Sequence, residues 1–486
     1  MNDVGEKMVC SDCIGNELLK EEVQTEGTKG SCSYCGKKKK GILISDLAEK
    51  VESVIDDFFQ LTDEDPTGDE FIREMNGYMW ERSGEEVNLV IQEIAEIEEE
   101  IAEDVRDYLE LKNCDRRDAR DGIENPFSAS AHYEHVGPDT WYFKETWSSF
   151  KRHIRTEARY FSRKAEYALR HIFYNLTNLV SVTGEKPVRV IEPGEKGSQI
   201  YRARMAESDH MLKTILSDPT RELGPPPSRK ARSGRMNASG ISVFYGGMNA
   251  ETCIAEIRPP VGSQVVVGKF EIIKPIHILN FKVLEEIFVH WNYFDPDLKM
   301  KWGSAVFFEE LVKELTRPIM PSDEEFEYLP TQVVAEFLAQ YVNPKLDGMI
   351  FRSSQTNNEG ENVVLFQHAS IVEQYILPPG CKVSIDMGQV YEDEVDDSIS
   401  IYEAEAEKTN EETPSAEEDS NPLKYLVNLT ELNTLRLRGL EDQSPLLPPT
   451  LRLDVKGIEV FRITAAKYTT ENRSVQRIRF SRKKYT

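Results

Sequence analysis

The chain has 486 residues with a formal net charge of −26, and hydrophobic residues occupy 39% of its positions. This length allows two or three domains with cores of their own. The negative charge argues against general affinity for nucleic acid or for anionic membranes. No run of about 18 apolar residues is present, so no transmembrane helix is predicted. The N-terminal MNDVGEKMVC lacks the pattern of a signal peptide, and we therefore expect a cytoplasmic protein with reduced thiols.

Four of the seven cysteines lie near the N-terminus, in CSDC and CSYC, with eighteen residues between the two pairs. Two CxxC pairs at this separation are typical of a zinc site with four thiolate ligands. Four protein ligands complete the tetrahedral shell, which predicts a structural zinc rather than a catalytic one. We predict a zinc knuckle over residues 1–40, and four unrelated thiols are the alternative. The predicted ligands are Cys10, Cys13, Cys32 and Cys35.

Residues 41–190 are predicted to be mostly α-helical. Within 83–111, apolar residues recur every three or four positions, and Ser83 with Glu86 has the pattern of a capping box. A second long helix is predicted over 145–179, with an apolar stripe that we interpret as core.

From residue 191 to residue 380, short strand-like runs alternate with turns and helical segments, which predicts an α+β domain. A helical insertion is predicted over 283–318. Residues 381–421 are predicted to be an acidic linker, because 391–420 holds thirteen acids and one lysine. Residues 422–486 are predicted to form a small C-terminal β element that ends in a basic stretch.

Four segments of the 191–380 region follow one another in an informative order. They are IYRAR with Arg202, SGRMNASGISVFYGG with Arg235 and Tyr245, a helix with Glu256 eleven residues after Tyr245, and LDGMIFRSS with Ser353 and Ser354 before ENVVLF. This order resembles a RES domain, the Arg–Glu–Ser toxin family related in fold to the ADP-ribosyltransferases. The cysteine-rich start and the helical region resemble the HEPN/RES N-terminal domain that precedes some RES domains.

The resemblance implies an enzyme that consumes NAD, by hydrolysis or phosphorolysis of the nicotinamide–ribose bond, in a toxin or defence system. By motif, Glu256, Arg202, Tyr245 and Ser353 would be catalytic, and Arg202, Arg235, Tyr245 and Ser353 would bind NAD. Ser353 is favoured over Ser354. The implied partners are NAD and an antitoxin or regulatory protein. Met236 replaces an aromatic residue that is common in the family, and the stretch between Glu256 and Ser353 is longer than in compact members.

The residue types fit this chemistry on their own terms. Cleavage of the nicotinamide bond builds an oxocarbenium-like ribose, which a carboxylate such as Glu256 can stabilise. The fork of Arg202 suits a pyrophosphate, Tyr245 can stack on a ring, and Ser353 can hydrogen-bond an amide or a hydroxyl. Each residue also has a structural alternative, such as an ion pair between Glu256 and Arg258.

Two other functions remain open from the sequence. A HEPN-type ribonuclease carries an Arg followed within a few residues by a His, and Arg204 with His210 is one match, although it overlaps a predicted strand. A non-enzymatic interaction protein with a zinc knuckle is the second alternative.

Overall fold

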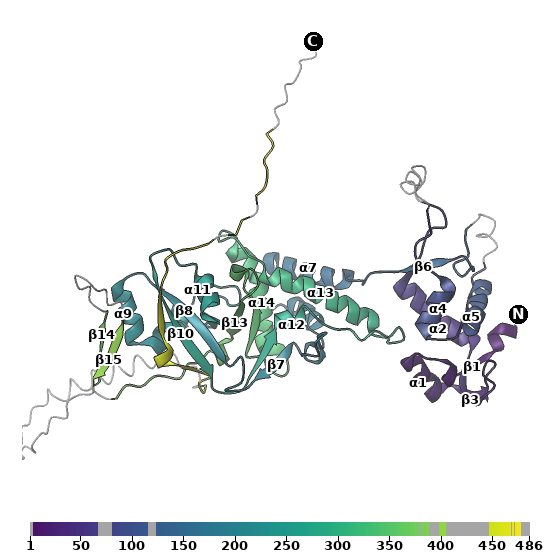
Figure 1. Ribbon diagram of the computed structural model, residues 1–486, viewed down its shortest axis with the longest axis horizontal. Coiled ribbons are helices and arrows are strands. Elements are labelled where there is room, and N and C mark those ends of the chain that lie inside the picture. Colours follow the sequence, from purple (N-terminus) through teal and green to yellow (C-terminus); the bar gives the residue numbers. More distant parts are fainter. Residues whose placement is uncertain are drawn as a thin grey trace, which may run out of the picture.

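The computed structural model describes residues 3–66, 80–114, 123–378, 381–387, 398–404, 447–467, 469–470 and 472–477. It has the mixed α+β architecture that the sequence predicts. Figure 1 shows a small N-terminal region at one end of the molecule and a large sheet with its helices at the other. In the described part of the chain, no helix combines the length and the apolar character that a membrane crossing requires.

The N-terminal region combines the cysteine-rich segment with several helices and two small sheets. Its first sheet has the order β1-β3-β2, and all of its pairs are antiparallel. A second small sheet has the order β4-β6-β5. The elements are β1 (Met8–Cys10), α1 (Glu17–Glu26), β2 (Thr28–Ser31), β3 (Lys38–Leu43), α2 (Ile44–Phe58), β4 (Phe59–Leu61), β5 (Glu85–Glu86), α4 (Val87–Ala95), α5 (Glu99–Lys112) and β6 (His132–His135).

Both long helices predicted from the sequence are in fact broken. The 83–111 segment forms α4 and α5, with Glu96 between them in the left-handed region at a φ of 51°. The predicted capping box is wrong, because Glu86 belongs to β5 and α4 has no side-chain cap. The 145–179 segment forms α7 (Trp141–Thr156) and α8 (Arg163–Ile172). Phe161, with a φ of 54°, separates them, and the Ser162 side chain caps α8.

The large sheet has nine strands in the order β16-β10-β8-β9-β13-β12-β11-β7, with β17 also paired to β10. Its pairs are antiparallel except for β11 with β12. The C-terminal strands β16 and β17 therefore extend the same sheet. The strands are β7 (Val188–Ile191), β8 (Gln199–Ala206), β9 (Phe244–Gly247), β10 (Gln264–Ile272), β11 (Ile276–Asn280), β12 (Gly348–Arg352), β13 (Glu361–Leu365), β16 (Leu451–Leu453) and β17 (Glu459–Arg462).

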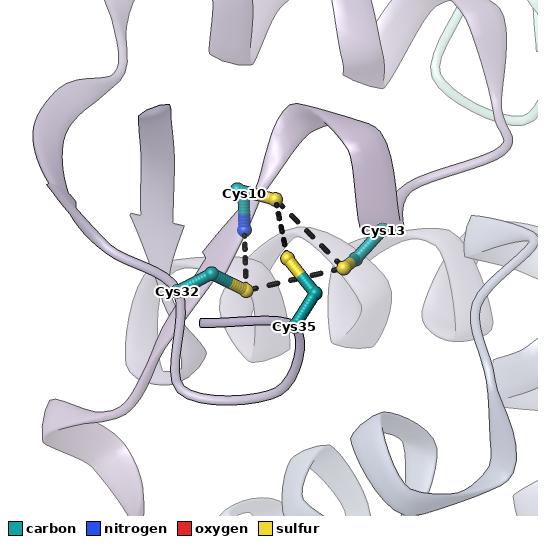
Figure 2. Close-up of side chains that lie close together, drawn as sticks. All are labelled: Cys10, Cys13, Cys32 and Cys35. Carbon is teal, nitrogen blue, oxygen red and sulfur yellow. Dashed lines mark hydrogen bonds between the residues drawn. The ribbon is translucent and has the colours of Figure 1, made fainter. Parts of the chain in front are cut away.

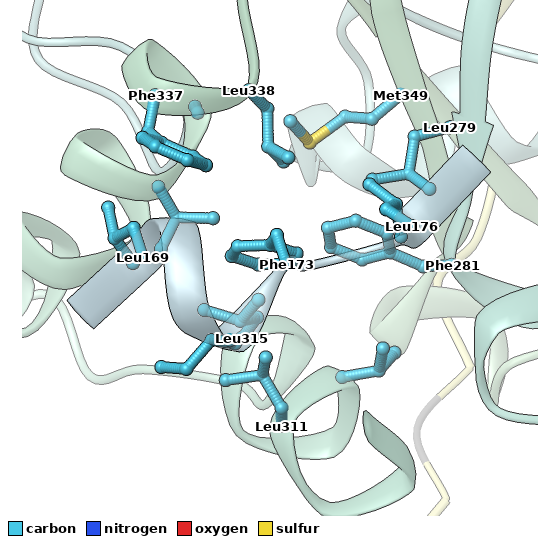
Figure 3. Packing of buried hydrophobic residues seen from close by; sticks show 14 of the residues in the cluster. Leu169, Phe173, Leu176, Leu279, Phe281, Leu311, Leu315, Phe337, Leu338 and Met349 are labelled. Atoms are coloured by element: carbon cyan, nitrogen blue, oxygen red, sulfur yellow. The ribbon is translucent and has the colours of Figure 1, made fainter. Parts of the chain in front are cut away.

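The helical insertion is longer than the predicted 283–318, because a second helix follows the first. The helices of this part of the chain are α9 (Asp209–Ser217), α10 (Pro219–Leu223), α11 (Ala250–Ile257), α12 (Phe281–Leu284), α13 (Leu298–Thr316) and α14 (Glu324–Tyr341). A separate hairpin pairs β14 (Lys382–Asp386) with β15 (Ser400–Ala404). One hydrophobic core joins α7, α8, α13 and α14 to the sheet, and Figure 3 shows Phe173 of this core close to Phe281 and Phe337.

A second core lies in the N-terminal region and extends beyond it. Residues of the cysteine-rich segment share this core with α2, α4 and α5. Tyr293 and Leu298, which lead into α13, are buried in the same core. The predicted 41–190 region is thus divided, since α7 and α8 pack in the first core instead. Most of the predicted acidic linker, and the basic stretch after residue 477, lie outside the described residues.

Candidate functional site

A pocket of about 510 Å³ lies where the sheet, α11 and the helical insertion meet. Strands β8, β9, β12 and β13 contribute one part of its lining, and the C-terminal half of α11 contributes another. The end of α13, the connection to α14 and the first turns of α14 form a further wall, and the turns at 233–235 and 354–355 complete the lining. The charged and aromatic lining residues are Arg202, Arg235, Tyr245, Glu256, Arg258, Glu324, Tyr328, Phe351 and Arg352.

The carboxylate of Glu256 is held from one side. Helix α11 begins after Asn249, whose side chain accepts a hydrogen bond from Thr252 N at 2.8 Å, and Glu256 lies in its last turn. Ser353 Oγ donates to Glu256 Oε1 at 2.6 Å, and Asn362 Nδ2 donates to the same oxygen at 2.7 Å. The residue is exposed, and Oε2 has no hydrogen-bond donor among the described residues. One carboxylate oxygen is thus fixed by the protein, and the other is left for a ligand.

Arg202 is a positive charge without a carboxylate partner in the described parts of the chain. It lies on β8, its Nη1 donates to Tyr245 O at 3.3 Å, and its guanidinium stands 5.2 Å from the centre of the Phe244 ring. Burial lowers the pKa of Arg202 to about 10, which still leaves it protonated at neutral pH. An unpaired guanidinium on a pocket wall is suited to an anionic group such as a phosphate.

Tyr245 contributes a ring to the pocket, but its hydroxyl is already engaged. The hydroxyl accepts from Met236 N at 2.9 Å and donates to Asn237 Oδ1 at 2.9 Å. Burial raises the pKa of Tyr245 well above its ordinary value, so the phenol stays neutral. The Tyr245 hydroxyl lies so close to the backbone at residue 234 that a Cβ there would be 2.7 Å from the oxygen, which explains why this position is a glycine. Tyr245 therefore fixes the GRMN turn beside the pocket.

Arg235 connects that turn to the helical insertion. Its Nη1 donates to Leu315 O and its Nη2 to Arg317 O, both at 2.8 Å, so it satisfies carbonyls at the C-terminal end of α13. Its guanidinium also stands 5.2 Å from the centre of the Tyr328 ring. Burial lowers the pKa of Arg235. The side chain thus holds two walls of the pocket together.

Sequence reasoning did not assign several residues that the structure brings to this site. Asn362 is the clearest, and its signal was present as the polar residue directly before the apolar run of ENVVLF. Ser354 lines the pocket, whereas Ser353 is fully buried behind Glu256. Glu324 and Tyr328 come from the insertion, whose sequence carries no motif for this pocket.

The alternative of an ion pair between Glu256 and Arg258 is not observed, since Arg258 Nε donates to Gln355 Oε1 at 3.0 Å. Cys253 is buried beside the pocket, and its Sγ donates to Tyr201 O at 3.1 Å. Arg204 and His210, on which the ribonuclease alternative depends, make different contacts. Arg204 binds Glu222, whereas the side chain of His210 is exposed at the start of α9.

The four N-terminal cysteines converge on one point, as Figure 2 shows. Their sulfur atoms all lie within 4.8 Å of one another, and three of the separations are 3.5, 3.8 and 3.9 Å. Four sulfurs bound to one zinc at about 2.3 Å would lie about 3.8 Å apart, so the donor set fits tetrahedral zinc. Cys10 N also donates to Cys32 Sγ at 3.4 Å, a contact that favours a thiolate. All four thiols are free of disulfides.

Comparison with known families supports the identity of the pocket-bearing region. A family model described as the RES domain matches residues 199–384. The matched range contains Arg202, Tyr245, Glu256 and Ser353, and it indicates an enzyme that acts on NAD. A search of curated proteins found no match to the chain. Over residues 199–384, this chain therefore matches the RES domain family.

Proposed function

We propose that this protein cleaves the nicotinamide–ribose bond of NAD, with water or phosphate as the acceptor. The observation that carries the proposal is the arrangement of Glu256, whose Oε1 receives both Ser353 and Asn362 while Oε2 is left for the substrate. Such a carboxylate can accept a hydrogen bond from a ribose hydroxyl and stabilise positive charge that develops on the ring.

In the proposed reaction, the bond between C1′ of the ribose and the pyridinium nitrogen breaks, and its electron pair neutralises the nicotinamide. An oxygen of water or phosphate then forms a bond to C1′, and a proton is released. The fixed orientation of Glu256 matters because it lets the carboxylate interact with the ribose without reorganising as charge develops. The role of the protein is therefore electrostatic and positional.

The charges around the pocket suit a dinucleotide. Arg202, Arg235 and Arg258 have no carboxylate partner among the residues that the structure describes. In a chain with a net charge of −26, three such arginines beside one pocket create a local positive field. That field favours the pyrophosphate of NAD, and Arg202 is best placed to bind it without losing a structural contact.

The zinc site has a separate role in this proposal. Cys10, Cys13, Cys32 and Cys35 would hold a structural zinc that crosslinks β1 and the turn after it to the loop between β2 and β3. Four thiolates leave no coordination position for a substrate, so the metal supplies stability and no chemistry at the pocket. Control by an antitoxin or another regulatory protein, expected from the resemblance to toxins, is part of the proposed biological setting.

The test is NAD concentration over time with the purified full-length chain, with and without phosphate, together with the Glu256→Gln variant. We expect loss of NAD with the wild type and a fall in kcat of about 100-fold or more for Glu256→Gln, the scale seen for loss of a transition-state contact. Glu251→Gln is the matched control, because Glu251 is exposed in the first turn of the same helix.

Mass spectrometry of the product distinguishes the acceptors, since water gives ADP-ribose and phosphate gives its 1-phosphate. NAD that stays intact with the wild type under both conditions contradicts the proposal. Equal activity of the wild type and Glu256→Gln would show that this carboxylate is not the reacting group.

A further inference from the structure

One wall of the pocket comes from a helix outside the four family motifs. Tyr328 and Glu324 lie one turn apart at the start of α14, and both line the pocket. The Tyr328 hydroxyl donates to Glu324 Oε1 at 3.2 Å. Oε2 of Glu324 has no donor among the residues described. An aromatic ring and a carboxylate oxygen are therefore presented side by side to whatever fills the pocket.

This wall is fixed rigidly to the rest of the site. Thr331 Oγ1 donates to Arg235 O at 2.5 Å, and Gln332 Nε2 donates to Gly234 O at 2.8 Å. The Arg235 guanidinium stands 5.2 Å from the centre of the Tyr328 ring, with its Nη atoms held by carbonyls of α13. Because the first turns of α14 are held by these contacts, little freedom is lost when a ligand packs against Tyr328.

The two sides of the pocket offer different chemistry. The side formed by α11 and β12 carries Glu256, the carboxylate proposed to face the reacting ribose. The α14 side has an aromatic ring and a hydrogen-bond acceptor. NAD has a second planar base, adenine, whose exocyclic amine donates hydrogen bonds. Stacking on an aromatic side chain suits any base, whereas a carboxylate accepts specifically from an amino group.

We propose that Tyr328 and Glu324 form the adenine subsite of this pocket, with Tyr328 as the stacking platform and Glu324 as the acceptor for the exocyclic amine. This inference rests on the proposed cleavage of NAD. It makes the helical insertion the part of the chain that selects an aminopurine dinucleotide, while Glu256 and its neighbours act at the other end of the substrate.

The experiment compares NAD with its hypoxanthine analogue, in which a carbonyl replaces the exocyclic amine, as substrates of the full-length protein. The variants are Tyr328→Ala, Tyr328→Phe and Glu324→Gln. The matched controls are Phe326→Ala and Glu325→Gln, which change exposed residues of the same helix that do not line the pocket. Thermal unfolding of each variant confirms that it is folded before kinetics are measured.

We expect Tyr328→Ala to raise KM for both dinucleotides about 5- to 150-fold with little change in kcat, the range reported for loss of one stacked base. Tyr328→Phe keeps the ring and is expected to behave like the wild type within a few-fold. The wild type should prefer NAD to the hypoxanthine analogue about tenfold or more in kcat/KM. Glu324→Gln should remove that preference, because its amide can donate to the carbonyl of the analogue.

A folded Tyr328→Ala variant with an unchanged KM, or one that loses kcat instead of raising KM, overturns the stacking role. A preference for NAD that survives in Glu324→Gln overturns the role of the carboxylate. Either result leaves NAD cleavage by the wild type intact, so it refutes the subsite alone. A wild type that consumes neither dinucleotide refutes the proposed function on which the subsite rests.

Discussion

Removing the two side chains that hold Glu256 gives the sharpest test of how the site works. Ser353→Ala deletes a hydrogen bond of 2.6 Å and Asn362→Ala one of 2.7 Å, both to the same carboxylate oxygen. Hydrogen bonds to a charged group contribute about 1.5–3 kcal/mol. Glu256 is exposed, so water can replace part of each loss, and the lower end of that range applies. At about 1.4 kcal/mol for each factor of ten, each single variant should lose about tenfold in kcat/KM.

The two losses should not simply add. While one donor remains, the Glu256 carboxylate stays oriented by a hydrogen bond to Oε1. In the double variant, neither donor is left, and the side chain can rotate among its rotamers. We therefore expect the double variant to lose more than the product of the single effects, with most of the excess in kcat. The assay is NAD cleavage by each purified protein, with the four proteins arranged as a double-mutant cycle.

Ser354→Ala is the matched control, because Ser354 is adjacent in sequence and lines the pocket without a bond to Glu256. Ser353 also accepts from Gln355 N at 3.3 Å, so the thermal midpoint of Ser353→Ala must be measured to separate local loosening from loss of orientation. The reasoning fails if folded Ser353→Ala keeps more than half of the wild-type kcat/KM, or if Ser354→Ala loses more activity than Ser353→Ala.

Three further predictions address parts of the chain away from Glu256. Replacing Arg202 with Gln should raise KM for NAD with a smaller effect on kcat, because an unpaired guanidinium is lost from the pocket wall; a change confined to kcat would contradict pyrophosphate binding. Cys13→Ser should lower both the bound zinc per chain, measured by atomic emission, and the thermal midpoint, and equal zinc in mutant and wild type would refute the four-thiolate site. The hydrogen bond from Arg82 holds the pKa of Glu124 below its ordinary value of 4.5, so this pair should stabilise the fold above about pH 4.5 and lose that contribution as the pH falls through the lowered pKa; Glu124→Gln should flatten this part of the stability–pH curve, which unfolding at several pH values would check.

The RES region was predictable from sequence because its signals are local. Each of the four motif residues lies within or beside a short apolar run with clear strand or helix patterning. The structure brings three of them, Arg202, Tyr245 and Glu256, to one pocket, and Ser353 lies directly behind Glu256. The choice of Ser353 over Ser354 depends on side-chain direction at the end of β12, which spacing alone does not determine. The assignment of a family was likewise possible because the motifs have a fixed order along the chain.

Other features were not predictable because they depend on contacts between distant segments. The helix breaks at Glu96 and Phe161 occur in sequences with continuous helical periodicity, and tertiary packing overrides that pattern. Tyr328 lies at the pocket beside Arg235, a residue far away in sequence that also contacts the end of α13. No local pattern in the insertion predicts that contact.

The aromatic cluster at the start of α13 shows why the N-terminal region and the RES domain are not independent parts. The ring of Phe58 lies 6.0 Å from that of Trp291, 5.8 Å from Tyr293 and 6.5 Å from Trp302, and Lys299 pairs with Asp57 at 2.8 Å. Large apolar side chains exposed by removing a partner surface favour aggregation. A fragment limited to residues 191–380 would lack Phe58 and would expose more of the rings of Trp291, Tyr293 and Trp302 while keeping α13.

Helix α13 has 19 residues and so spans about 28 Å between that cluster and the pocket. Its first residue, Leu298, is buried in the core of the N-terminal region, and carbonyls at its C-terminal end are bound by Arg235. Both ends are thus fixed by segments far away in sequence. The wall of the pocket that carries Tyr328 lies on α14, which Arg235 connects to the end of α13, and α13 leads to the core of the N-terminal region. We therefore expect the full chain, rather than the motif-bearing region alone, to be the physical unit in which the site is formed.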